Sequence, residues 1–446
     1  MTDDASPDQQ PELLPGLVRA TVKQSQAQAR AAKARKAAEA AVSDVDPVAR
    51  VLVDLNLAHL DRPFDYAVPA AMADSAVPGA RVKVRFAGKD VDGFVVERAA
   101  ASDHVGRLTP LRRVVSAEPV LSAAVATLTS EVAQRYAGVR SDVLRLAVPP
   151  RHATVEKEPS LPEPPLATTL SADACEAGWA PYPPGGAFLR HVHRGAAPRA
   201  VWGALPGEDW PTRLAEAAAT ALLAGRGTIV CVPDARDVAR LDAALEALLG
   251  PDHHVVLTAD AGPARRYRAF LAVARGARRI VVGTRAAAFA PVAKLGLVAI
   301  WDDGDDLFAE PRAPYPHTRE VLLLRAAREQ AAVLVGGHAR SVEADQLVRT
   351  GWAHEIDAPR EEIRRRVSTA VTGSTEHDLR RDPHAAAARI PRQVYEAIRD
   401  AVTSGPVLVQ TPRAGYALAL ACDRCRTPAT CTACHGPLAL SAPTSP

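Results

Sequence analysis

The sequence predicts a multidomain α/β protein whose largest part is a doubly wound parallel sheet. Its length of 446 residues is enough for roughly two to four domains. From about residue 185 to 368, short apolar runs alternate with stretches of helical periodicity. The predicted strands are 228–233, 254–259, 279–284, 297–302 and 333–337, and the predicted helices are 212–224, 235–248, 263–275 and 318–331.

Before this sheet, the sequence predicts a basic tail and a small β-rich domain. Residues 1–46 are rich in Ala, Gln, Lys and Arg, so we expect a disordered basic tail, with a DNA-touching arm as the alternative. Residues 79–86 alternate apolar and basic side chains with period two, and a turn at Gly88 leads into a return strand at 91–96. With the apolar run that starts at Val48, these features predict a β-rich domain over 47–116.

Residues 117–168 predict a helical module followed by a linker. Helical apolar spacing over 120–148 is broken at Gly138, which fits two short helices of a winged-helix-like module. Six prolines between 149 and 169 predict a stiff linker or a crossing loop. After the sheet of 169–368, a helix at 391–403 and a strand at 407–410 predict the start of a further lobe within 369–446.

Composition and charge exclude several classes of protein. The net charge of +3 is small for this length, so the whole chain does not argue for nucleic acid, although local basic runs occur at 19–36 and 364–366. No stretch reaches the roughly 18–20 uninterrupted apolar residues of a membrane helix. The N-terminus is polar and lacks a signal-peptide core, so we expect a cytoplasmic protein with no membrane partner. No GxGxxG follows a predicted strand, and no nucleophile elbow is visible.

Four of the six cysteines form a metal-binding pattern near the end of the sequence. Cys422-x₂-Cys425 and Cys431-x₂-Cys434 are two knuckles separated by five residues, and such pairs present thiolates to a tetrahedral Zn²⁺. Either each knuckle supplies half of a site, or all four thiolates close on one ion; His435 is a further candidate ligand. Cys175 and Cys231 stand alone, and we expect them to be buried free thiols.

Four segments resemble the PriA replication restart helicases (primosomal protein N′). They are PFDYAVP at 63–69, RIVVGTRAAAFAP at 279–291, LGLVAIWDDGDD at 295–306 and RAGYALALACDRC at 413–425. The form is the one expected in actinobacteria, where the ATPase motifs are degenerate. The resemblance implies a 3′-DNA-end-binding domain over 47–116, a winged-helix-like module, a degenerate RecA-like lobe over 169–368, and part of a second lobe with zinc-binding cysteines over 369–446.

The resemblance also implies where the DNA end binds. In the family a Phe-Asp pair lines the pocket for the 3′ end, and Phe64 and Asp65 match it. The ring can stack on or flank the terminal base, and the carboxylate can accept a hydrogen bond from the 3′-hydroxyl; a core Phe and a turn-forming Asp are the alternative. A Lys of the family's pocket falls near Thr109, so its contact is absent or comes from Arg112 or Arg113.

Basic side chains on one strand face are the candidates for phosphate contact. Lys83 and Arg85 lie on the alternating strand, and Lys89 lies in the turn that follows it. Such cations give salt-sensitive, sequence-independent affinity for DNA. A solvated strand face is the alternative interpretation.

The ATP-binding motifs of a motor are missing at three places. A P-loop, G-x-x-x-x-G-K-[ST], cradles phosphates with backbone N–H groups, Lys and a metal-binding hydroxyl. In register the sequence has Gly203 at the first Gly position and Gly207 one residue before the second, while Asp209 takes the Lys position and Trp210 the Ser/Thr position. Trp301 stands where the family has its Mg²⁺-holding Asp.

The acidic residues after Trp301 and the third motif also differ from those of a working motor. Asp302 and Asp303 follow Trp301 as either a residual metal site or an ordinary acidic turn. The third motif, Gly-Ser-Ala-Thr-Pro in the family, reads Gly336-Gly337-His338-Ala339-Arg340. We therefore expect no ATP-driven unwinding.

These features predict a non-motor, nucleoid-associated replication restart protein. By the resemblance, it would bind branched and single-stranded DNA and act as a platform for primosome proteins, the replicative helicase and single-stranded-DNA-binding protein. The family holds up to two zinc ions in the cysteine region. The alternatives are an ATP-dependent 3′→5′ helicase with unorthodox motifs, and an interaction module or pseudogene product without a DNA role. The sequence is also C-terminally short for the family, as expected of a gene fragment, a frameshifted frame or a natural short form.

Overall fold

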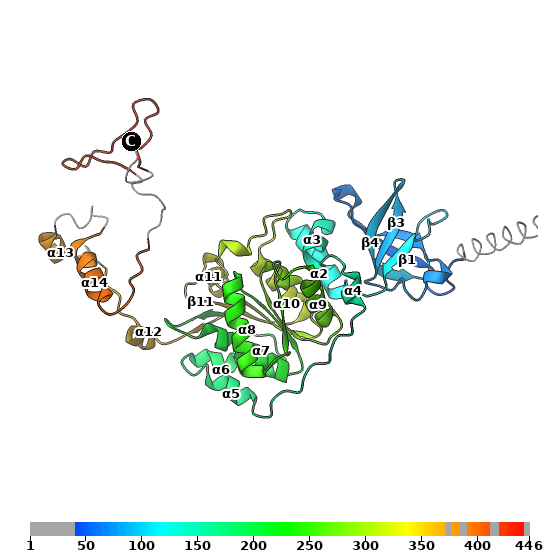
Figure 1. The fold of residues 1–446 in the computed structure, drawn as a ribbon, viewed down its shortest axis with the longest axis horizontal. Coiled ribbons are helices and arrows are strands. Elements are labelled where there is room, and N and C mark those ends of the chain that lie inside the picture. Colours follow the sequence, from blue (N-terminus) through cyan, green and yellow to red (C-terminus); the bar gives the residue numbers. More distant parts are fainter. Residues whose placement is uncertain (1–40, 372–375, 383–389, 411–418, 441–446) are drawn as a thin grey trace, which may run out of the picture. The chain divides into compact units, whose positions relative to one another are not determined.

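The structure is a computed structural model that describes residues 41–371, 376–382, 390–410 and 419–440. It separates into two units, one up to Val367 and one from Ser368 onward (Figure 1). Residues 1–40 of the tail predicted for 1–46 therefore lie outside the described residues. Within the described residues, no helix is long and apolar enough to cross a membrane.

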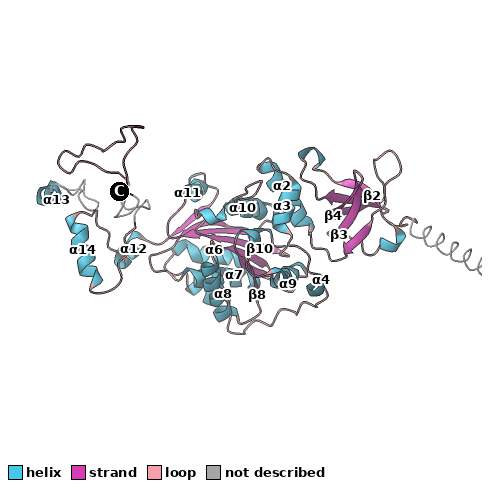
Figure 2. Ribbon diagram, turned by 45° about the horizontal axis from the view of Figure 1, so that its top comes forward, coloured by secondary structure: helices cyan, strands magenta, loops and turns pink. Residues whose placement is uncertain are grey.

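The first part of the larger unit is a five-stranded antiparallel sheet (Figure 2). The strands run in the order β2-β1-β4-β3-β5 and comprise β1 (Val48–Val53), β2 (Phe64–Ala67), β3 (Arg81–Phe86), β4 (Lys89–Ala99) and β5 (Arg113–Ser116). A two-residue turn joins β3 to β4, with φ of 46° at Ala87 and 80° at Gly88. Positive φ at both positions matches the twist of a hairpin, so the predicted turn and return strand are confirmed.

Alternation along β3 separates core from surface. Val82 and Val84 are fully buried, whereas Lys83 and Arg85 point away from the core. Tyr66 of β2 and its neighbours on β1 and β4 complete this core. The period-two prediction for this strand is therefore confirmed.

Three helices follow the sheet: α2 (Ala123–Arg135), α3 (Arg140–Ala147) and α4 (Ala153–Glu156). Residues 117–168 contain no strand, so the wing of the predicted winged-helix-like module is not confirmed. Instead, α2 packs against α10 (Thr318–Glu329), and both helices share one hydrophobic core with the larger sheet. Gly138 separates α2 from α3 as predicted, and a Cβ there would lie only 2.2 Å from the Cβ of Pro314.

The proline-rich segment after α4 crosses the surface of the lobe in a fixed position. Arg275 donates to the carbonyl oxygens of Glu156 and Glu158 at 2.8 and 2.6 Å. Arg278 donates to the carbonyl oxygen of Leu161 at 2.8 Å. These contacts make the segment a crossing loop rather than a free linker.

The lobe is built on a seven-stranded parallel sheet of order β12-β6-β11-β10-β7-β9-β8. Its strands are β6 (Arg199–Gly203), β7 (Gly227–Cys231), β8 (His254–Leu257), β9 (Ile280–Gly283), β10 (Leu295–Trp301), β11 (Ala332–Gly337) and β12 (His354–Asp357). The five predicted strands are confirmed as β7 to β11, and the doubly wound parallel architecture with them. The sequence analysis did not predict β6 or β12.

Helices cover both faces of this sheet (Figures 1 and 2). One face carries α5 (Ala172–Ala177), α6 (Pro183–His193), α7 (Trp210–Leu223) and α8 (Ala235–Leu249). The other carries α9 (Pro263–Ala274), α10, α11 (Val342–Arg349) and the short η3 (Arg285–Phe289), together with α2 and α3. Cys231 is fully buried and Cys175 nearly so, which confirms them as buried free thiols. Burial raises the pKa of Cys231 to about 12.

After the lobe come α12 (Arg360–Arg366), α13 (Glu376–Arg381) and α14 (Arg392–Val402). The helix predicted at 391–403 is confirmed as α14. The strand predicted at 407–410 is wrong: these residues are described without a strand, and Leu408 is 91% exposed. An extended segment needs a neighbouring strand to pair with, and the described residues beside it provide none.

Candidate nucleic-acid site and a filled nucleotide site

Phe64 and Asp65 are consecutive residues of β2, so their side chains point to opposite faces of the strand. The Phe64 ring is half-buried against the core and meets Phe86 edge-on, with ring centroids 5.0 Å apart and an interplanar angle of 69°. The Arg62 guanidinium lies 5.2 Å from the Phe64 ring centroid. Phe64 is therefore held between the core and a cation.

Asp65 points to the other face of β2 and is already engaged by protein groups. The Ser102 hydroxyl donates to Asp65 Oδ2, and Arg50 Nε lies 3.8 Å from Asp65 Oδ1. Arg50 also forms an ion pair with Glu97, whose carboxylate raises the pKa of the Arg50 guanidinium. The carboxylate of Asp65 is thus oriented by neighbours while its side chain keeps 19% exposure.

A small cleft lies on the same face of β2 as Asp65. Ala67, two residues along the strand, lines this cavity of about 300 Å³. The other lining residues are Val42, Pro47, Val48, Pro69, Arg107, Leu108 and Pro110. Arg107 is the one charged residue among them, it is exposed, and it makes no hydrogen bond or ion pair among the described residues.

Arg107 was not among the predicted site residues, whereas Arg112 and Arg113 were the predicted substitutes for the family's Lys. Neither of those two lines the cleft. Arg112 Nε lies 3.5 Å from Asp90, and Arg113 aligns with Lys83 across the β3–β5 pairing. Arg107 lies two residues before Thr109 in the same loop, and this closeness in sequence could have identified it.

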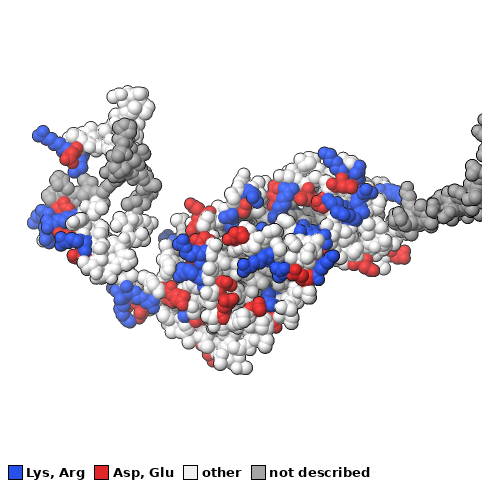
Figure 3. Space-filling model, in the orientation of Figure 1, with Lys and Arg blue, Asp and Glu red and all other residues white. Residues whose placement is uncertain are grey.

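The predicted phosphate-binding cations lie on the outer face of β3 and β4, where acidic residues offset part of their charge. Lys83 Nζ is 3.0 Å from Asp92, and Arg85 is 3.2 Å from Asp90. Lys89 is the first residue of β4 rather than part of the turn, and its exposed side chain makes no hydrogen bond or ion pair among the described residues. Figure 3 shows positive and negative side chains interspersed over the visible face of this unit, so no broad patch of one sign covers it.

A second basic cleft lies in the lobe, at the GTR segment that the sequence comparison singled out. Arg145, Arg266, Arg285 and Arg312 line this cavity of about 250 Å³, against one carboxylate, Glu310. Arg285 is 3.4 Å from Glu310. Arg266 is half-buried, its guanidinium has no hydrogen bond or ion pair among the described residues, and burial lowers the pKa of this group.

At the carboxyl edge of the parallel sheet, tryptophans occupy the positions where a motor binds nucleotide. The loop from Gly203 to Trp210 joins β6 to α7, which is the place of a P-loop. Trp210 stacks on Trp301 at the end of β10, with ring centroids 4.5 Å apart and an interplanar angle of 11°. Both side chains are almost completely buried, and Trp202 and His338 pack against Trp301.

Three backbone N–H groups of this loop already have protein acceptors. The N–H of Gly203 donates to Asp357 at 3.1 Å, that of Ala204 to the Gly337 carbonyl at 2.9 Å, and that of Leu205 to the Tyr182 hydroxyl at 2.9 Å. Pro206 has no N–H to offer. These three donors are therefore satisfied inside the protein and are not available to a phosphate.

Acidic side chains around the loop oppose a triphosphate. Glu208 accepts from the Tyr182 hydroxyl at 2.7 Å, and Asp209 accepts from Thr212 at 2.6 Å. A neighbouring cavity of about 680 Å³ has one cation, Arg340, which pairs with three carboxylates: Asp345, Glu355 and Asp357. Burial and the Glu355 carboxylate raise the pKa of Asp357.

The acidic turn after β10 is structural. Asp303 is 3% exposed and pairs with Arg319 at 2.7 Å, and the Ser341 hydroxyl donates to it at 2.7 Å. Asp302 adopts a φ of 54°, and burial with the neighbouring carboxylates of Asp305 and Asp303 raises its pKa. Over the described ranges, no group of three or more potential metal ligands gathers.

The two cysteine knuckles of the second unit repeat the same turn. The N–H of Arg426 donates to the Cys422 carbonyl, and that of His435 donates to the Cys431 carbonyl, each at 2.9 Å. Arg426 and His435 both have positive φ, at 60° and 56°. Hydrogen bonds from Thr427 lower the pKa of Cys425 to about 7, and backbone N–H groups lower that of Cys431. Both turns thus favour thiolates, but in the part described the four sulfurs do not form one ligand group.

Comparison with known proteins shows which family the chain resembles. Residues 50–149 match the family described as the 3′ DNA-binding domain (3′BD) of PriA. The chain is 52% identical over 395 residues to the probable replication restart protein PriA of Mycobacterium tuberculosis, and 50% identical over 392 residues to that of Mycobacterium leprae. Over most of its own length the chain is similar to the PriA proteins. These alignments cover 88% and 86% of this chain but 60% of either mycobacterial PriA, so the chain spans less than two thirds of those relatives.

A more distant PriA and a solved helicase extend the comparison. The replication restart protein PriA of Treponema pallidum is 25% identical over 390 residues, covering 85% of this chain and 56% of that protein. Among solved structures, the DUF1998 helicase MrfA covers 54% of this chain and 43% of its own, with 12% identity and a TM-score of 0.30. That TM-score is too low to carry an argument. The similarity to PriA therefore rests on sequence, and it agrees with a β-rich 3′BD followed by a parallel sheet with helices.

Proposed function

We propose that this PriA-like chain binds branched DNA carrying a 3′ end at abandoned replication forks and does so without a motor. The observation that carries the proposal is the match of residues 50–149 to the 3′ DNA-binding domain of PriA. In this proposal the lobe is a scaffold that holds DNA and partner proteins. Primosome proteins, the replicative helicase and single-stranded-DNA-binding protein are the proposed partners, at the bacterial nucleoid.

The cleft beside β2 is the proposed receptor for the terminal nucleotide. Its apolar wall suits a base, and exposed Arg107 suits the adjoining phosphate. Asp65, oriented by Ser102 and Arg50, accepts a hydrogen bond from the 3′-hydroxyl. Phe64 lies on the opposite face of the strand, so we assign it a positioning role through the core rather than a stack on the base.

The basic cleft at the GTR segment is a proposed second contact to the phosphate backbone. Arg266 is half-buried and lacks a protein partner among the described residues, so a phosphate oxygen would supply the missing acceptor. Lys83, Arg85 and Lys89 add weaker, screened attraction, because the first two are paired with Asp92 and Asp90.

An ATP-dependent 3′→5′ helicase is the alternative function. It requires phosphate donors, a Lys and an Mg²⁺ site at the β6–α7 loop. The Trp210–Trp301 stack occupies that position, and the N–H groups of Gly203, Ala204 and Leu205 already have protein acceptors. These contacts favour the motor-free proposal.

Zinc is the proposed cofactor of the second unit, held by Cys422 and Cys425 and by Cys431 and Cys434. Each knuckle presents two thiolates from a tight turn, which suits a soft divalent cation. When bound, zinc would supply structural stability rather than chemistry. Metal analysis of the purified chain, with Cys425→Ser as the comparison, tests this assignment: zinc that is retained by both proteins contradicts it.

The proposed function is tested by fluorescence anisotropy on model forks whose leading strand ends at the branch in a 3′-hydroxyl or a 3′-phosphate. We expect the wild-type chain to prefer the 3′-hydroxyl fork, and Asp65→Ala to lose that preference by about tenfold. Equal affinity of the wild type for both forks contradicts the proposal.

A further inference from the structure

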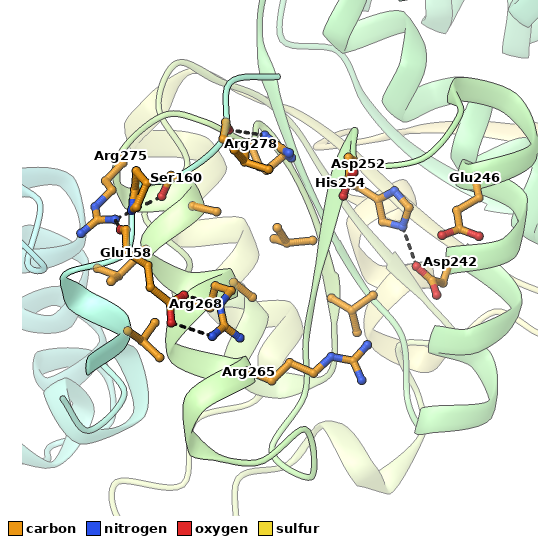
Figure 4. Close-up of a pocket in the computed structure, with 18 residues that line it drawn as sticks. Glu158, Ser160, Asp242, Glu246, Asp252, His254, Arg265, Arg268, Arg275 and Arg278 are labelled. Atoms are coloured by element: carbon orange, nitrogen blue, oxygen red, sulfur yellow. Dashed lines mark hydrogen bonds and ion pairs between the residues drawn. The ribbon is translucent and has the colours of Figure 1, made fainter. Parts of the chain in front are cut away.

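One side of the lobe's sheet ends in an unpaired strand edge. Among the described strands β8 pairs only with β9, so part of its backbone N–H and C=O groups point away from the sheet. Val255 and Val256 of β8 are half-buried and uncharged. A cavity of about 540 Å³ lies beside this strand, which we call the β8-edge cleft (Figure 4).

The two walls of the β8-edge cleft carry opposite charges. Asp242 and Glu246 come from α8 on one side of the strand, and Arg265 and Arg268 come from α9 on the other (Figure 4). Because α8 and α9 cover opposite faces of the sheet, the acidic and the basic wall lie on opposite faces of β8.

Some of these charges are neutralised inside the protein, and others are free. His254 Nε2 lies 2.6 Å from Asp242, and Arg268 lies 2.7 Å from Glu158. The side chains of Arg265 and Glu246 are exposed and make no hydrogen bond or ion pair within the described part of the chain. Figure 4 shows Arg265 extending from α9 without a marked partner. Arg265 and Glu246 are therefore a free cation and a free anion on opposite walls, and Asp252, in the turn before β8, is a further exposed carboxylate that lines the cleft.

The opposite charges of the two walls determine which kind of molecule can bind in the β8-edge cleft. DNA would meet repulsion from the acidic wall, and a uniformly acidic or basic peptide would be repelled by one wall or the other. An added β-strand places successive side chains on opposite faces, so a segment that alternates acidic and basic residues satisfies both walls at once. Its main chain would pair with the free edge of β8.

We propose that the β8-edge cleft binds an extended segment of a partner protein by strand addition, with acidic side chains toward Arg265 and basic ones toward Glu246. This interaction is separate from DNA binding and does not depend on it. The segment needs about four to six residues, the length of an ordinary edge strand.

The test uses the full chain and labelled peptides in fluorescence anisotropy. The probe is acetyl-(Lys-Glu)₃-amide, and its comparison is the block isomer acetyl-Lys₃-Glu₃-amide, which has the same composition and net charge. We expect the alternating peptide to bind about tenfold or more tightly than the block isomer, and N-methylation of alternate peptide nitrogens to remove its binding. Equal binding of both isomers, binding that survives N-methylation, or no binding of the alternating peptide at millimolar concentration overturns the proposal.

Charge reversal gives a second, independent readout. Arg265→Glu and Glu246→Lys should each weaken the alternating peptide by about fivefold, because each places two like charges together. The double variant exchanges the free charges on the two walls, so binding should recover with the peptide shifted by one residue. Arg236→Glu, an exposed change on α8 outside the cleft, is the matched control and should bind like wild type. Failure of the double variant to recover, with thermal stability unchanged, overturns the proposal.

Discussion

Trp210 at the start of α7 stacks on Trp301 at the end of β10, with ring centroids 4.5 Å apart. In a P-loop motor these two positions carry the Ser/Thr and the Asp that hold Mg²⁺. Here two metal-binding groups are replaced by two aromatic rings that bind each other. The two substituted positions therefore contact each other directly, and this contact supports the proposal of a chain without a motor.

Trp210→Ala should lower the free energy of unfolding by about 3–5 kcal/mol, because it removes a buried ring and leaves a cavity beside Trp301. Chemical denaturation followed by far-ultraviolet circular dichroism measures the change. Tyr315→Ala is the control, since that side chain is 63% exposed, and its effect should stay below about 1 kcal/mol. Equal effects of the two variants would show that the stack does not stabilise the lobe.

Phe64 distinguishes a packing role from stacking on DNA. Phe64→Ala should destabilise the chain by about 1–3 kcal/mol, because the half-buried ring leaves the core and Phe86. Phe64→Leu keeps most of that apolar volume and should preserve both stability and fork affinity. Denaturation and fork anisotropy are measured on both variants. A stable Phe64→Leu protein that has lost fork affinity would instead support direct stacking on the terminal base.

Arg107 and Arg112 make a matched pair, because one lines the cleft beside β2 and the other pairs with Asp90. Arg107→Ala should weaken fork binding by about 1–2 kcal/mol and reduce the slope of log K against log salt by about one. Arg112→Ala should leave both quantities close to those of wild type. Salt titrations of fork anisotropy provide the measurement, and the reverse order of effects would place the phosphate contact at Arg112.

Glu216 makes stability depend on pH. It is 7% exposed on α7, and burial raises its pKa to about 7 despite Arg213 at 3.0 Å. The folded state therefore holds a proton that the unfolded chain releases near pH 4.5, so stability falls as the pH rises from about 4.5 to 7.

Glu216→Gln cannot release that proton. It should match wild type near pH 4 and exceed it by on the order of 2 kcal/mol at pH 8. Glu361→Gln, at an exposed position of α12, should track wild type throughout. Denaturation midpoints between pH 4 and 8 give the comparison, and parallel curves for wild type and Glu216→Gln would contradict the assignment.

Strands β7, β9, β10 and β11 were predictable, because strands buried on both faces read as continuous apolar runs. All seven residues of β10 are buried, for example. The β12 strand, His-Glu-Ile-Asp, is a mostly exposed edge strand, and its sequence resembles a loop. The segment 407–410 shows the opposite case, where β propensity without a pairing strand yields no strand.

The candidate site was predictable in its residue types but not in its contacts. The resemblance to PriA placed Trp210 and Trp301 at motor positions, yet their stack joins two segments that are distant in sequence. Such a contact follows from the order of the parallel strands, which the sequence pattern does not specify. Arg107 was missed for the same reason, since the loop that carries it meets β2 only through tertiary pairing at Ala67.

The most direct test of the account is phosphate release from ATP by the full chain, with Mg²⁺ and saturating fork DNA, alongside strand separation of the same fork. We predict fork binding without nucleotide, ATP turnover no higher than in a protein-free blank, and no strand separation. DNA-stimulated ATP turnover with unwinding, carried by the wild-type chain, would contradict the proposal of a chain without a motor.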